Sequence, residues 1–166
     1  VYATTGQGFS PDGAVLRDGQ PVTAADSPDL VSLVRAAVLC NEADLHHRDG
    51  TWVWRGDAVD VAVLSLGVKL GIRREPTLEQ FPIEDSIPFE PEHQFAASFH
   101  RDGPGAVVFV KGAPERLFDM CGDLLSREER TRQEQRAMEM AARGLRVLAV
   151  ASAPLRELPP PNEIPG

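Results

Sequence analysis

Proline and glycine interrupt this sequence so often that only short helices and strands fit between them. The 166 residues include 14 prolines and 14 glycines. In the middle of the chain the prolines follow one another closely, at Pro76, Pro82, Pro88 and Pro91. Each proline removes a backbone N–H and restricts the residue before it, so it ends or bends an element. The longest apolar runs, 106–110 and 147–151, fall far short of the ~18 residues that cross a bilayer.

Turn and cap signals give the order of the elements. Glycine turns divide residues 1–22 into hairpins. Ser27-Pro28-Asp29 begins a helix that continues to Asn41, and Asp57 caps a second helix that ends at Gly71. The remaining predicted elements are a loop at 46–50, strands at 51–54, 81–87, 94–101 and 106–111, helices at 114–120 and 126–143, and a central strand at 145–153.

This order predicts an α/β (α+β) fold in which a mainly antiparallel, twisted sheet is flanked by helices. The length fits one domain, which we place at 1–158, and the proline-rich residues 159–166 are predicted to be a connector. The chain opens on Val1 in the middle of an apparent strand, so we expect it to be part of a longer protein.

The charge of the chain excludes several classes of partner. The formal net charge is −8 and the sequence pI is near 5.0. Nucleic acids and anionic membrane surfaces need a basic partner, so neither is expected. A polyanionic ligand would need a few local cations. Cys40 and Cys121 are too few for a disulfide framework and are predicted to be buried, inert thiols.

The common ligand motifs are missing from the sequence. There is no Gly-x-x-x-x-Gly-Lys-Ser/Thr, and Gly6-x-Gly8 lacks the third glycine of a dinucleotide site. The densest group of possible metal ligands is Cys40, Glu42, Asp44, His46 and His47. A zinc site would use paired Cys or His on a fixed frame, so a polar loop after a helix explains this group better.

The segment Lys111-Gly112-Ala113-Pro114-Glu115 is the most informative one. It stands where an apolar strand ends and a helix begins. A lysine at a strand end can project its ammonium past the sheet, and Gly112 removes a side chain that would block a ligand. The residues alone indicate an anion or nucleotide site, with a lysine on a solvated turn as the open alternative.

Lys-Gly-Ala-Pro-Glu resembles the lysine motif of the nucleotide-binding domain of P-type ATPases, especially the type II cation pumps of bacteria. Further segments agree in the family's order across nearly the whole chain. They are LVRAAVLCN at 33–41, Gly56-Asp57-Ala58-Val59-Asp60, the Pro-Phe segment at 87–95, and GLRVLA at 144–149.

The resemblance implies an ATP site, with Mg-ATP as the ligand in the parent pump. Phe89 would stack on adenine, with a core aromatic as the alternative. Lys111 would line the adenine pocket, and Gly112 and Ala113 would form its floor. Arg146 would contact ribose or phosphate, unless it is only a surface charge. Asp60 would lie near the exocyclic amine, and Gln94 could donate a hydrogen bond to phosphate.

Two departures from the family pattern suggest a low ATP affinity. Val59-Asp60 stands where the family often has Thr-Glu, which removes a hydroxyl and shortens the acid. His93-Gln94 stands where many members carry a basic residue.

The sequence contains no Asp-Lys-Thr-Gly-Thr, the motif of the family's phosphorylated aspartate. The resemblance therefore implies a monomeric module that holds ATP without hydrolysing it and delivers it to the phosphorylation domain of a cation pump. Its partners would be the phosphorylation and actuator domains, on the cytoplasmic side of a plasma (inner) membrane. The transported cation is not predicted, because membrane helices select it.

Two alternatives remain at this point. One is a degenerate module of the same ancestry, regulatory or structural, with little ATP affinity. The other is an unrelated small-molecule enzyme, which would need a polar catalytic constellation that these residues do not supply.

Overall fold

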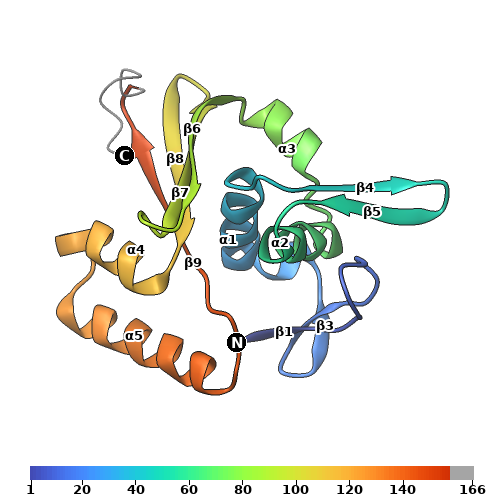
Figure 1. Ribbon diagram of the computed structural model, residues 1–166, viewed down its shortest axis with the longest axis horizontal. Helices are drawn as coiled ribbons and strands as arrows, with labels where there is room; N and C mark the ends of the chain where they lie inside the picture. The colour runs from blue at the N-terminus through green and yellow to red at the C-terminus, as the bar shows by residue number, and fades with distance from the viewer. Residues whose placement is uncertain (158–166) are drawn as a thin grey trace. The chain divides into compact units, whose positions relative to one another are not determined.

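The computed structural model describes residues 1–157, which divide into two compact units. Unit 1 is Val1–Pro82, and unit 2 begins at Ile83 (Figure 1). The predicted connector at 159–166 lies outside the described residues. The assignment of 1–158 to one domain stays a prediction. Within the described part, no helix is both long and apolar enough to cross a membrane.

Unit 1 combines two small antiparallel sheets with three α-helices. Its elements are β1 (Tyr2–Thr4), β2 (Val15–Arg17), β3 (Gln20–Val22), the 3-10 turn η1 (Ala24–Asp26), α1 (Pro28–Leu39), β4 (Asp44–Arg48), β5 (Thr51–Arg55), α2 (Ala58–Lys69) and α3 (Arg74–Gln80). One sheet has the order β1-β2-β3, and β4 pairs with β5 in the other. The hairpins predicted in residues 1–22 are confirmed.

An aliphatic core holds unit 1 together. Helices α1 and α2 pack against each other. Helical spacing brings Val34 and Val38 of α1 together with Val61 and Leu64 of α2 in one buried cluster. The predicted caps of α2 are confirmed: Asp57 Oδ1 accepts a hydrogen bond from the Val59 N–H at 2.8 Å, and Gly71 follows α2 with φ 75°. The predicted capping hydroxyl of α1 is wrong, because Ser27 makes no capping hydrogen bond, and α1 ends at Leu39 instead of Asn41.

The prediction of a loop at 46–50 was wrong, because most of this segment belongs to strand β4. Asp49 and Gly50 form a tight turn with φ values of 49° and 77°. Two consecutive positive φ values match the right-handed twist of the flanking strands, so an Asp-Gly pair favours a hairpin. His46 pairs with Val53 and His47 with Trp52 across this hairpin. Helix α3, which contains Pro76, was not predicted either.

Unit 2 is a four-stranded antiparallel sheet with helices on it (Figure 1). Its elements are β6 (Ile83–Glu90), β7 (Phe95–Asp102), β8 (Gly105–Gly112), α4 (Pro114–Cys121), the 3-10 turn η2 (Gly122–Leu124), α5 (Arg127–Ala142) and β9 (Ala149–Leu155). Helix α4 packs against β8 and β9, and α5 packs against α4. Leu117 of α4 joins Phe95, Phe99 and Val110 in the core. The predicted mixed fold, antiparallel sheets flanked by helices, is confirmed.

The prediction of a central strand at 145–153 was wrong in position and in start. Strand β9 begins at Ala149 and lies at an edge of the sheet, beside β8. Residues 145–148 precede it without regular structure. Their apolar side chains suggested a doubly covered strand, but Val147 and Leu148 border a surface groove instead.

Helix α5 begins at the predicted capping box and buries none of its residues. The Ser126 hydroxyl donates to Glu129 Oε2 at 2.6 Å and accepts from the Glu129 N–H at 3.2 Å. The bond from Ser126 lowers the pKa of the Glu129 carboxyl. Gly144 follows the helix with φ 77°, as predicted for its C-terminal stop.

Candidate functional site

A groove of about 630 Å³ crosses the surface of unit 2. Its lining comes from the β6–β7 turn, the β8–α4 junction, one side of α5 and the segment before β9. The lining residues are Phe89, Pro91, Gln94, Gly112, Ala113, Pro114, Glu115, Ala137, Met138, Ala141, Arg146, Val147 and Leu148. Pockets for small molecules usually measure ~300–1,000 Å³ and are mostly apolar with a few polar groups. This groove meets both criteria.

Another hollow, in unit 1, is smaller than the groove of unit 2. It measures about 230 Å³, below the usual size of a ligand pocket. Arg73 and Arg74 line it together with Asp44 and Glu75. We therefore take the groove of unit 2 as the candidate site.

Phe89 and Gln94 reach the groove from the two ends of the β6–β7 turn. Phe89 keeps 48% of its surface exposed although it is a large apolar residue. Gln94 has φ 62°, and its N–H donates to the Glu90 carbonyl at 2.9 Å, which closes the turn. In the same turn, His93 Nδ1 lies 3.3 Å from Glu90 Oε2. An exposed aromatic ring beside an amide donor can stack on a planar ring and hydrogen-bond to its substituents.

Gly112 serves the backbone more directly than it serves a ligand. A Cβ built at this position would lie 2.8 Å from the Phe95 Cα, and closer still to the Gln94 carbonyl oxygen. The glycine allows the end of β8 to meet the start of β7, where the Ala113 N–H donates to the same Gln94 carbonyl at 3.0 Å. The sequence-based reason, room for a ligand, is replaced by a close approach of two backbone segments.

Lys111 is buried where the sequence suggested a projecting ammonium. Only 4% of its surface is exposed. Within β8 it pairs with Ala96 of β7 and Val150 of β9. It stands directly before Gly112 in the sequence, but within the described part of the chain it is not one of the residues that line the groove.

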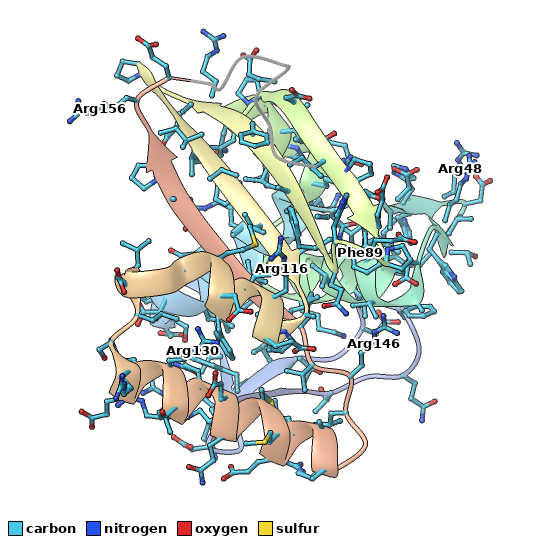
Figure 2. All side chains as sticks on the ribbon, turned by 60° about the vertical axis from the view of Figure 1, so that its left-hand side comes forward. Arg48, Phe89, Arg116, Arg130, Arg146 and Arg156 are labelled. Atoms are coloured by element: carbon cyan, nitrogen blue, oxygen red, sulfur yellow. The ribbon has the colours of Figure 1, made fainter. Side chains whose placement is uncertain are left out.

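Arg146 and Glu115 bring opposite charges to the groove. Arg146 is exposed in the segment before β9 and lies on the same side of unit 2 as Phe89 (Figure 2). Glu115 stands in the first turn of α4. Within residues 1–157, Arg146 and Glu115 are the two ionisable residues that line the groove. The guanidinium can bind phosphate oxygens through two N–H groups, whereas the carboxylate repels them.

Asp60 belongs to unit 1 and is not one of the described residues that line the groove. Its carboxylate oxygen Oδ2 accepts a hydrogen bond from the Glu42 N–H at 3.1 Å. Asn41 Nδ2 donates to the Asp60 carbonyl at 3.1 Å, and Asn41 Oδ1 accepts from the Ala43 N–H at 2.9 Å. These bonds tie the end of α1 to the start of α2, so Asp60 and Asn41 hold the backbone of unit 1.

The possible metal ligands at residues 40–47, which the sequence analysis attributed to a polar loop, do not gather at one point. Cys40 is buried, and Cys121 in unit 2 is partly buried. His46 Nδ1 lies 3.5 Å from Glu75 Oε1, on the α3 side. Among residues 1–157, no three His, Cys, Asp or Glu side chains converge as metal ligands do.

The wall that α5 contributes to the groove was not predicted from the sequence. Ala137, Met138 and Ala141 form this wall. A signal was available, because the sequence of α5 changes from REERTRQEQR to AMEMAA after Arg136. A cluster of apolar residues at the end of a charged, unburied helix indicates a contact surface.

Comparisons with known proteins agree with this architecture. The family model described as "P-type ATPase, cytoplasmic domain N" matches residues 29–164. The chain is 35% identical over 90% of its length to "Cation-transporting ATPase pma1" of Synechocystis, and 37% identical over 87% to "Probable cation-transporting ATPase F" of Mycobacterium bovis. It is 30% identical over 90% to "Calcium-transporting ATPase type 2C member 1" of Bos taurus. It spans 18%, 17% and 16% of these three relatives. This chain belongs to the family of the cytoplasmic N domain of P-type ATPases.

Proposed function

We propose that the chain binds ATP in the groove of unit 2 and does not hydrolyse it alone. Phe89 stacks on the adenine ring, Gln94 donates to the nucleotide, and Arg146 binds ribose or phosphate oxygens. Gly112 and Ala113 form the floor. Lys111, which precedes Gly112 in the sequence, and Asp60 of unit 1 remain proposed contacts that rest on the family resemblance.

The observation that carries this proposal is the groove itself. An exposed aromatic ring and an amide donor from the β6–β7 turn and a guanidinium from the segment before β9 border one hollow. That set suits a ligand with a flat ring at one end and anionic oxygens at the other. An adenine nucleotide has this chemistry.

The role in the parent protein is part of the proposal. The relatives are named as cation-transporting ATPases, and this chain corresponds to less than a fifth of each. We propose that the parent is a type II cation pump, whose phosphorylation domain supplies the aspartate that receives the phosphoryl group. In it, this module would act on the cytoplasmic side of the membrane with the phosphorylation and actuator domains. Mg-ATP would be the ligand, and the isolated module would be a monomer.

A titration of ATP into the purified chain tests the proposal. Calorimetry should give a saturable isotherm. ATP at about ten times Kd should add ~1.4 kcal/mol of stability and raise the melting midpoint by roughly 3–6 °C. Phosphate release should match that of buffer, because the sequence contains no Asp-Lys-Thr-Gly-Thr. Hydrolysis that persists through purification would contradict the assignment, as would a flat isotherm at millimolar ATP.

A second candidate function is a degenerate module that keeps the fold and has little ATP affinity. Glu115 in the groove, Gln94 in place of a basic residue and the net charge of −8 favour it. The same ATP titration and melting experiment distinguish an ATP-binding module from a degenerate one. A melting midpoint that does not respond to millimolar ATP would support the degenerate module.

A further inference from the structure

Helix α5 carries apolar side chains that remain at the surface of unit 2. It buries none of its residues. Met138 keeps 66% of its surface exposed, and Ala137 and Ala141 flank it on the groove side. These positions follow the spacing i, i+1, i+4, so they share one face of the helix. The groove therefore has an apolar wall on α5, separate from the Phe89 segment.

The wall combines one long flexible side chain with two small ones. The alanines leave open space over the helix, and the methionine can move across that space. A thioether is polarisable and unbranched, so it adapts to irregular apolar surfaces and makes favourable contacts with aromatic rings. These properties suit contact with a purine ring or the apolar side of a ribose, and they give no help with phosphates.

We infer that Met138 is a binding residue that packs on the nucleoside part of the bound nucleotide and forms a second wall of the site beside Phe89. The inference rests on the proposed ATP function and adds an element, α5, to the site. It predicts that the contact is the same for ATP, ADP and AMP, because they share the nucleoside.

The chain provides an internal control for this contact. Its three methionines are Met120, Met138 and Met140. All three are exposed, but only Met138 lines the groove among the described residues. Met140 lies two positions further along the same helix, about 200° around its axis. Both residues lie on α5 and both are exposed, but they differ in whether they line the groove.

The direct experiment is NMR of the chain labelled with ¹³C at the methionine methyl groups. Each signal is assigned from a Met→Leu variant. Because ring currents act only at short range, saturating AMP or ATP should shift the Met138 methyl signal and leave those of Met120 and Met140 in place. In parallel calorimetry, Met138→Ala should weaken ATP, ADP and AMP alike by about two- to fivefold. Met140→Ala should leave all three affinities unchanged.

The failure of this inference can be distinguished from failure of the proposed function. If the unmodified chain binds ATP while the Met138 signal stays in place and Met138→Ala binds normally, α5 is not part of the site. The ATP proposal then stands alone. If the unmodified chain binds no nucleotide, both fail together. A loss confined to ATP and ADP would overturn the nucleoside contact.

Discussion

The two units place their apolar residues differently. In unit 1, the valines and leucines of α1 and α2 meet in an enclosed cluster. In unit 2, the sheet has its own core with Leu117, yet Phe89, Met138 and Leu145 remain exposed. Phe89 and Met138 both border the groove. Unit 1 also exposes Leu33, Val53 and Trp54, so the difference lies in the groove. In unit 2 the exposed Phe89 and Met138 border the surface that we propose as the ligand site.

The motifs that carry the family resemblance divide in the same way. In unit 1, Asn41 and Asp60 bind backbone groups that join α1 to α2. Gly56 has φ 122°, and a Cβ there would lie 2.7 Å from the Ala43 Cβ. In unit 2, the Pro-Phe and Lys-Gly-Ala-Pro-Glu segments contribute Phe89, Gly112 and Ala113 to the groove. A shared motif can therefore preserve either the scaffold or the site.

The largest expected effect separates core from surface. Leu64 is 4% exposed in the core of unit 1, whereas Leu145 of unit 2 is 50% exposed. Leu64→Ala should lower the free energy of unfolding by ~2–5 kcal/mol, because it removes buried surface and leaves a cavity. Leu145→Ala should change it by less than about 0.5 kcal/mol. Urea denaturation followed by circular dichroism measures both. Equal losses of unfolding free energy in the two variants would contradict the difference between the buried Leu64 and the exposed Leu145.

The next effect tests whether Gly112 serves the backbone. Gly112→Ala should cost ~1–3 kcal/mol of stability, since its Cβ would collide with the backbone at Gln94 and Phe95. Gly105→Ala, on the same strand, is the matched control, because the nearest atom to its Cβ is 3.5 Å away. If Gly112→Ala were as stable as Gly105→Ala and lost only ATP binding, the ligand-access reason would be right after all.

The local elements could be predicted from sequence where a cap or turn signal stood beside a clear period. Asp57, Ser126 and Gly144 marked their helix ends correctly. Residues 145–148 were wrongly predicted to be part of a strand. An apolar run has the same composition whether it forms a buried strand or borders a groove, so the sequence pattern cannot distinguish the two. Strand β4 was missed because its exposed His46, His47 and Arg48 resemble a loop.

The candidate site was predictable only in part, because it depends on packing between distant segments. The family resemblance indicated Phe89, Gln94, Gly112, Ala113 and Arg146, and the groove brings them together. The change from charged to apolar residues along α5 indicated a contact surface, but it did not show that Met138 would reach the same groove. Nothing local to β8 showed that Lys111 would be buried.

A smaller effect, on binding alone, tests the ligand side of the comparison. Phe89→Ala should weaken ATP, ADP and AMP by similar factors, about 1–3 kcal/mol each, because stacking acts on the shared adenine. Stability should change little, since the ring is already half exposed. Met120→Ala, exposed but outside the lining, is the control. If Phe89→Ala unfolded the chain while it still bound nucleotide, Phe89 would be a core residue.

The smallest effect concerns the two charges in the groove, which should act in opposite directions. Glu115→Gln removes a carboxylate from the lining and keeps its shape, so ATP should bind about two- to threefold more tightly, with a smaller gain for AMP. Arg146→Ala should weaken ATP and ADP more than AMP, by ~1–2 kcal/mol for the triphosphate, because it removes a charge-assisted contact. Both effects should diminish as salt is raised, since the site is open to solvent. Calorimetric titration of the three nucleotides at low and high salt measures both effects.

If Glu115→Gln weakened ATP binding, the carboxylate would be a hydrogen-bond acceptor for the nucleoside, and phosphate repulsion would no longer explain the low ATP affinity that we expect. Equal losses of AMP and ATP in Arg146→Ala would place the guanidinium away from the phosphates.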